Sequence, residues 1–246
     1  MSLRIGRIVA LAASLGAIGA MSLAATAAAT EVEHQEFNNW VVAGSLTPKK
    51  LNEPVVLPKG STFNGNAELQ YTGNFENISG TVTGTVAVPP FNASLALLGV
   101  LPTTVGVTFQ EVGNSEGTVT SAPESACPNN TGGTPCVTMS VLTNVNVGIT
   151  TLGTSVGGSG VSLGASVGTS CETSEPVSFH LSTQMTLNKL DIYGPQFTGT
   201  TTIPPIKCEG PEALLLAPAL SAVMSGPDNA YELEITRPGL TRPKPS

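Results

Sequence analysis

Apolar and polar residues alternate along much of this chain with a period of two. Between residues 137 and 149, most odd positions hold Val, Met or Ile, and most even positions hold Thr, Ser, Asn or Gly. Because successive side chains of a β-strand point to opposite faces of a sheet, this pattern predicts a long strand with one buried face and one face toward water.

The same alternation predicts further strands along the chain. Longer runs cover residues 78–88, 105–109, 161–167, 177–187 and 231–235, and shorter ones cover 40–46, 55–57 and 67–71. Gly, Pro and Asn between the runs favour turns. The predicted fold class is therefore all-β, an antiparallel sandwich or barrel of about nine or more strands.

A short phrase occurs twice, at residues 83–91 and 198–206. It consists of Thr-Gly-Thr, two further residues, Val or Ile, Pro-Pro and an apolar residue. Two adjacent prolines end a strand, because Pro cannot donate a hydrogen bond to the ladder. An internal duplication would divide the domain into halves at residues 37–122 and 136–236. Chance recurrence of these common residues is the alternative.

Residues 211–224 interrupt the β pattern and predict one short apolar helix near the C-terminus. Ala and Leu favour a helix there, and Gly226-Pro227 follows as a stop signal. Pro218 is expected to kink the helix or split it in two. The segment is too short to span a bilayer. It would either plug an open end of the fold or form a lid over a lipid-sized cavity.

The first 29 residues have the pattern of a secretory signal peptide. Arg4 and Arg7 precede an apolar stretch at residues 8–23, and small residues follow, with predicted cleavage near Ala27 to Ala29. An uncleaved membrane anchor is the alternative. We therefore expect a secreted β domain at residues 30–236, outside the cytoplasm or in the cell envelope, with no transmembrane span. Residues 237–246, which are basic and rich in proline, predict a disordered tail.

Four cysteines in a secreted chain predict two disulfides. Three connectivities exist for four cysteines. Cys127 and Cys136 flank a turn-rich segment, which favours a bridge between them and leaves Cys171 to pair with Cys208. A structural zinc site is disfavoured, because the chain has no Cys-x-x-Cys and only two histidines.

Removal of the signal peptide leaves eight Lys and Arg against seventeen Asp and Glu, a formal net charge of −9. Such an acidic chain lacks the basic surface that nucleic acids require, so we expect no nucleic-acid partner. Asp228, Asn229 and Glu232 offer oxygen ligands but no complete calcium loop, and we expect no metal or cofactor.

Few residues in this sequence suit catalysis. His180 falls on the polar face of its predicted strand, and a hydrolase would need it together with Asp191 or Asp228 and a serine that the sequence does not single out. The acidic residues lie mostly in loops, and aromatic residues that would stack on a sugar are scarce, which disfavours a glycosidase. Trp40 is expected in the core. We therefore predict no catalytic residues and no enzymatic activity.

The alanine-rich leader, the Thr-, Gly- and Val-rich strands, the paired cysteines and the Thr-Ile-Pro-Pro phrase at residues 202–205 together resemble secreted β-rich envelope proteins of GC-rich Gram-positive bacteria. The resemblance implies location and fold class only. The predicted function is an envelope-associated structural or interaction protein whose partner is an unknown envelope component. A carrier of an apolar, lipid-like ligand is the first alternative, and a hydrolase using His180 is the second.

Overall fold

The computed structural model describes residues 30–73, 76–97, 101–127, 130, 133–154, 169–210 and 213–240. The predicted signal peptide, the predicted strand at residues 161–167 and the end of the tail at 241–246 lie outside these ranges. Within them the fold is all-β, as predicted. Thirteen strands, paired antiparallel, form one sheet that is sandwich-like in shape.

The strands and helices follow one another along the chain as follows. They are β1 (Thr30–Thr47), β2 (Val55–Val56), β3 (Thr62–Thr72), β4 (Glu76–Ala87), β5 (Phe91–Leu97), β6 (Leu101–Glu111), β7 (Ser115–Ala122), the short 3-10 helix η1 (Glu124–Ala126), β8 (Cys136–Thr154), β9 (Ser170–Thr173), β10 (Val177–Thr186), α1 (Leu187–Tyr193), β11 (Gln196–Ile203), β12 (Ile206–Glu209), α2 (Ala213–Met224) and β13 (Gly226–Thr236).

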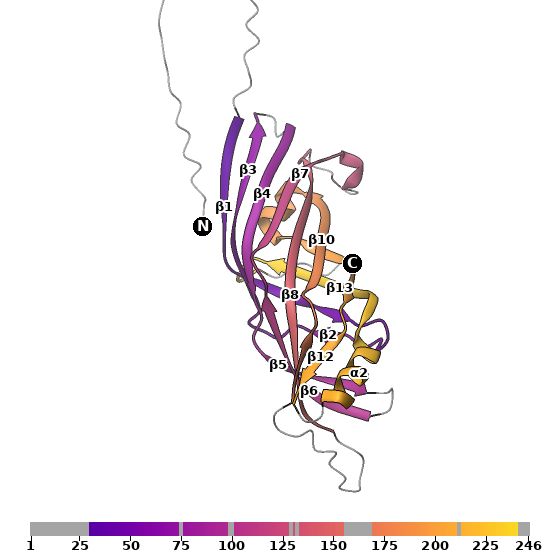
Figure 1. Cartoon of the computed structure of the whole chain (residues 1–246). Coiled ribbons are helices and arrows are strands. Elements are labelled where there is room, and N and C mark those ends of the chain that lie inside the picture. The colour runs from indigo at the N-terminus through magenta and orange to yellow at the C-terminus, as the bar shows by residue number, and fades with distance from the viewer. Residues whose placement is uncertain are drawn as a thin grey trace, which may run out of the picture.

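The sheet curls around a single core. Its main path runs β11-β13-β1-β3-β4-β7-β8-β6-β5, and β10 adds to the other edge of β8. Figure 1 shows β13 crossing behind β8 and β10. The curl brings β10 against β11, although no strand ladder joins them. Side chains connect this seam between β10 and β11 instead. Thr201 of β11 donates a hydrogen bond to the carbonyl of Ser178, and Tyr231 of the adjacent β13 donates one to the carbonyl of His180.

A β-bulge in β1 lets this strand turn the corner of the sheet. The pairing with β3 is irregular between Phe37 and Trp40, and Asn39 has φ 52°, a left-handed conformation that Asn tolerates. The Asn39 amide donates to Oδ1 of Asn64 at 2.8 Å. Phe37 and Trp40 are an odd and an even position, which a regular strand would place on opposite faces. The extra residue brings both onto the same buried face, where their rings meet edge to face.

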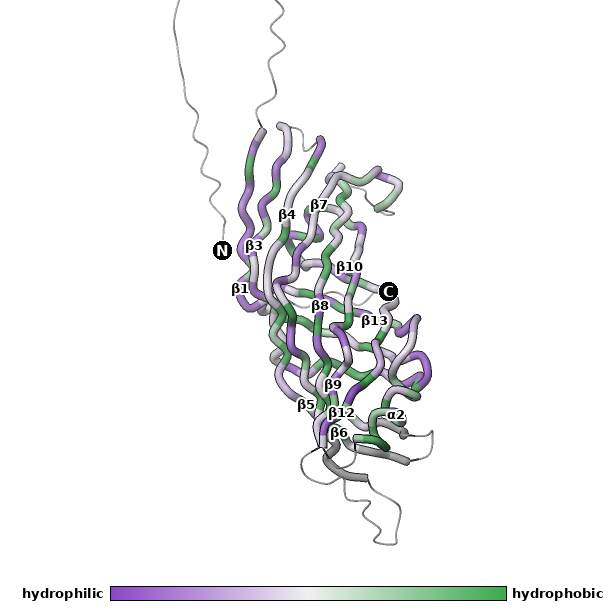
Figure 2. Tube along the Cα trace, viewed as in Figure 1, coloured by the Kyte–Doolittle hydropathy of each residue, from purple (hydrophilic) through white to green (hydrophobic). Residues whose placement is uncertain are grey.

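The core lies on the inner face of the curled sheet. Hydrophobic and hydrophilic positions alternate along its strands (Figure 2). The inner positions of β8 are the odd residues from Val137 to Ile149, all of which are buried. This alternation is the pattern that the sequence predicted, and it places apolar side chains from distant strands in one cluster.

Both Pro-Pro phrases follow the end of a strand, as expected from the missing amide hydrogen. β4 ends at Ala87 before Pro89-Pro90, and β11 ends at Ile203 before Pro204-Pro205. The segments that follow differ, because the first phrase leads into strand β5 and the second leads through β12 into helix α2. The duplication therefore stays a prediction.

Three sequence-based expectations need correction. The strand predicted at 40–46 begins earlier, at Thr30, because the acidic segment before it pairs with β3 from Thr72 to Gly65. The predicted strand at 177–187 ends at Thr186, whose hydroxyl caps the unpredicted helix α1. Of the kink or split expected at Pro218, only the split is contradicted, since Pro218 removes one hydrogen bond, to the carbonyl of Leu214 in an exposed first turn.

Candidate functional site

A cavity of about 80 Å³ lies inside the curled sheet. Apolar side chains from seven strands form most of its wall. They are Val42 and Leu46 of β1, Val86 of β4, Phe109 of β6, Val145 of β8, Phe179 and Leu181 of β10, and Phe197, Leu233 and Ile235 of β11 and β13. Leu57 and Val88, which are partly exposed, complete it toward the surface. Small-molecule sites share this concave, mostly apolar character, at larger volumes of roughly 300 to 1,000 Å³.

Two smaller cavities continue this space through the core. One of about 30 Å³ shares Phe197 and Ile235 with the main cavity. Another, of about 60 Å³, shares Phe37 and Met139 with the second. Neighbouring cavities therefore share parts of their walls. The row of cavities suits a linear apolar chain better than a compact ligand.

Helix α1 closes the far end of this row. Leu187, Leu190 and Asp191 line the third cavity together with Trp40. Gly194 follows the helix with φ 77°, and a Cβ there would clash with the carbonyl of Ile235, so the chain turn requires glycine. Trp40 is buried, as expected, and its ring also faces this cavity.

A short polar chain interrupts the apolar wall of the main cavity. The carboxylate of Glu111 accepts hydrogen bonds from the Val86 amide at 2.7 Å and from the Ser115 hydroxyl at 2.6 Å. The Ser115 oxygen in turn lies 2.7 Å from that of Thr143. Ser115 and Thr143 are 1% and 5% exposed, so these hydroxyls depend on each other for hydrogen bonding. Glu111 and Thr143 both line the cavity.

Tyr231 supplies the other polar group inside the cavity. Its hydroxyl donates to the His180 carbonyl at 2.7 Å, and its ring contacts Phe179 edge to face. Burial raises the pKa of Tyr231 above the usual value of 10.0, because the phenolate would lose its hydration. The hydroxyl therefore stays protonated and keeps its hydrogen bond across the seam.

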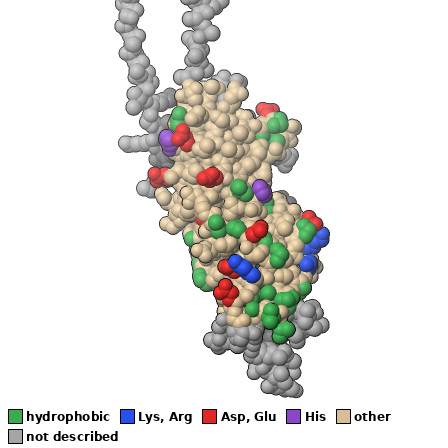
Figure 3. Space-filling view, viewed as in Figure 1, with side chains coloured by type: hydrophobic (Ala, Val, Ile, Leu, Met, Phe, Trp, Pro, Cys, Tyr) green, Lys and Arg blue, Asp and Glu red, His purple; other side chains and the backbone are tan. Residues whose placement is uncertain are grey.

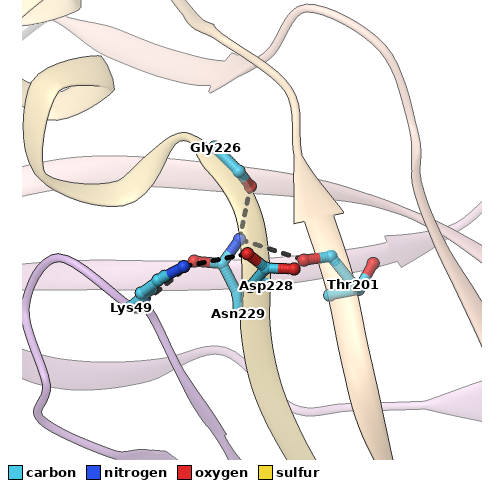
Figure 4. A network of polar contacts seen from close by, with 5 residues as sticks. All are labelled: Lys49, Thr201, Gly226, Asp228 and Asn229. Carbon is cyan, nitrogen blue, oxygen red and sulfur yellow. Dashed lines mark hydrogen bonds and ion pairs between the residues drawn. The ribbon is translucent and has the colours of Figure 1, made fainter.

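The network drawn in Figure 4 is structural. The amide of Asn229, which is 2% exposed, donates to the carbonyls of Thr201 and Gly226 and accepts from the amide of Lys49. Asp228 forms an exposed ion pair with Lys49 at 2.8 Å. These contacts tie the turn after β1 to β13 and β11. They occupy Asp228 and Asn229, two of the three side chains that the sequence offered as calcium ligands.

The residues considered for hydrolysis are not brought together. His180 lies on the outer face of β10, beside Ser140 and Ser182 in a shallow hollow. Within the described residues its imidazole has no hydrogen-bond or ion-pair partner. Asp191 lies in α1 and Asp228 binds Lys49. Neither carboxylate orients the imidazole, which a Ser-His-Asp arrangement requires.

The four cysteines form two disulfides, Cys127–Cys136 and Cys171–Cys208. This is the pairing that the spacing favoured. The first closes the loop between β7 and β8, and the second joins β9 to β12, where the two cysteines are direct cross-strand partners. Neither bridge lines any of the three apolar cavities.

Helix α2 lines none of the three apolar cavities. It packs on β12, where the Ser221 hydroxyl accepts from the Ile206 amide, and it buries Leu220 and Met224. Leu214 and Leu215 are 91% and 79% exposed. Hydrophobic side chains gather at this end of the face shown in Figure 3. No helix among the described residues is long and apolar enough to cross a membrane.

The sequence matches no protein-family model, no curated protein and no solved structure. Function must therefore be inferred from the site itself.

Sequence reasoning missed the polar chain at the cavity, although a signal for it exists. Glu111 continues the inward odd positions Val105, Val107 and Phe109, and Thr143 lies within the odd series of β8. A polar residue at an inward position indicates a buried hydrogen-bond network or a site. The pairing of Ser115 with Thr143 needs the fold, because these residues lie on different strands.

Proposed function

We propose that the protein is an extracytoplasmic, non-enzymatic binding protein that holds an apolar chain inside its curled sheet. The row of apolar cavities is the observation that carries this proposal. The main cavity admits roughly five to eight water-sized groups, which matches a short alkyl chain. Two disulfides fit a protein of an oxidising compartment.

An envelope-associated structural or interaction role is the second candidate. The exposed Leu214 and Leu215 favour it, because exposed apolar patches mark protein or membrane contact sites. This role requires no ligand in the cavities. The two candidates therefore differ in what the isolated protein contains.

The mass of the secreted protein separates these candidates. The full-length chain would be expressed in a secreting bacterium, and the exported protein weighed by native and by denaturing mass spectrometry. An apolar-chain carrier would show a native mass that exceeds the denatured mass by one bound molecule, or would gain such an increment after incubation with octanol. Equal masses under both conditions, with and without octanol, would contradict the carrier function and leave the interaction role.

A further inference from the structure

The polar groups that face the main cavity are Glu111, Thr143 and Tyr231, and their hydrogen-bond directions can be assigned. A carboxylate accepts only, so the Ser115 hydroxyl must donate its single hydrogen to Glu111. The Ser115 oxygen therefore accepts from Thr143, and the Thr143 hydrogen is used in that bond. The Thr143 hydroxyl oxygen can therefore only accept a hydrogen bond from a ligand in the cavity, through its free lone pair.

Tyr231 is in the same position. Its hydroxyl hydrogen is donated to the His180 carbonyl, so only the lone pairs of its oxygen remain. Ser45 is the remaining polar residue of the wall. It alternates with the buried Leu46 along β1, which directs its side chain to the other face of the strand.

The cavity therefore offers hydrogen-bond acceptors and one negative charge, in an otherwise apolar wall. From this we infer that the bound chain carries a hydrogen-bond donor at its polar end, a hydroxyl or an amine, and that chains ending in a carboxylate are rejected. The inference rests on the proposed function and specifies its ligand class. A donor would bind the free lone pairs of Glu111 and Thr143, whereas a carboxylate would find no donor and would meet a like charge.

Three ligands with the same alkyl chain test this inference on the unmodified full-length protein. Octanol, octylamine and octanoate would be titrated by calorimetry under identical buffer conditions. We expect octanol and octylamine to bind, and octanoate to bind at least about tenfold more weakly, because like-charged contacts are unfavourable. Octanoate binding as tightly as octanol would overturn the inference and leave the carrier function standing. No binding of any of the three would overturn the carrier function itself.

The variant Glu111→Gln tests the cause of the discrimination. An amide can accept from Val86 through its oxygen and donate to Ser115 through its nitrogen, so the local hydrogen bonds are kept. Ser115 would then donate to Thr143, and the Thr143 hydroxyl would be free to donate into the cavity. We expect octanoate to bind this variant at least about tenfold more tightly than the unmodified chain.

Glu116→Gln is the matched control. It removes the same charge from an exposed position on the outer face of β7, beside His180 rather than the cavity. This control should retain the rejection of octanoate. Equal effects of the two variants would show that net charge alone causes the discrimination, and would contradict the role assigned to Glu111. Circular dichroism of each variant checks that the fold is kept.

Discussion

At the scale of single residues, a few buried polar side chains hold together strands that are far apart in the sequence. Asn229 makes three hydrogen bonds from an almost fully buried position, to Lys49, Thr201 and Gly226. All three partners are main-chain groups. A buried main-chain group that loses its hydrogen-bond partner lowers the stability by more than an average hydrogen bond contributes.

We therefore expect Asn229→Ala to lower the free energy of unfolding by about 2 to 3 kcal/mol. Denaturant unfolding followed by circular dichroism measures the loss. Asn66→Ala, at an exposed position of β3, should change it by less than about 0.5 kcal/mol. Similar losses in both variants would contradict the role of the buried amide.

Tyr231 predicts a loss of stability in alkaline solution. Burial raises its pKa, so the folded protein holds the phenolic proton more tightly than the unfolded chain, whose pKa is near 10.0. This contribution is fully present below pH 10 and is lost as the pH rises through the folded-state pKa. Unfolding free energies measured below and above pH 10 should fall more steeply for the unmodified chain than for Tyr231→Phe.

The same variant has a second expected effect. Without the hydroxyl, the His180 carbonyl loses its donor at the seam, and stability at neutral pH should fall by about 1 kcal/mol. An unchanged alkaline profile in Tyr231→Phe would show that other groups dominate. Tyr71, whose pKa is raised by partial burial and by Glu33 and Glu31, would be the next residue to replace.

At the scale of elements, alternation predicted the strands well where one face is buried and the ladder is regular. It did not predict β5, β7, β9 or β12, and at two further places its failure has a clear physical reason. The bulge at Asn39 changes whether odd or even residues of β1 face the core. This change is set by pairing with the partner strand β3, which the local sequence does not identify. Helix α1 is shorter than a typical helix and continues an alternating strand, so its cap at Thr186 and Gly194 was the only local signal.

The two disulfides fix different elements and should differ in energetic weight. Cys127–Cys136 spans a sequence separation of 9 and Cys171–Cys208 a separation of 37. On the loop-entropy model, these lengths correspond to about 3 and about 4 kcal/mol. The longer bridge also secures two strands of four residues each, β9 and β12.

We expect Cys171→Ala with Cys208→Ala to destabilise the protein more than Cys127→Ala with Cys136→Ala, by about 1 kcal/mol. Denaturant midpoints of the two double variants, compared with the oxidised unmodified chain, give the order. The reverse order would show that the loop between β7 and β8 contributes more to the fold than its length implies.

At the scale of the whole molecule, the sheet encloses its apolar face and leaves a row of cavities along the core. Alternation predicted the fold class but not this row, because cavities arise where side chains from distant strands fail to fill the space between them. The polar chain around Glu111 likewise depends on the fold of the whole molecule. Its members come from β6, β7 and β8, and only the curl of the sheet aims them at one space.

The central claim, that the main cavity takes up an apolar chain, is tested most directly by filling that cavity. Val145 lines only the main cavity, and Val145→Phe would occupy its volume. Val32→Phe, at a position that is 50% exposed, is the matched control. Octanol would be titrated by calorimetry into the unmodified chain and both variants, at several temperatures, after circular dichroism confirms folding.

The account predicts saturable binding of one octanol with a negative heat-capacity change, retained in Val32→Phe and lost in Val145→Phe. Absence of saturable binding to the unmodified chain, or equal binding by the folded Val145→Phe variant, would contradict it.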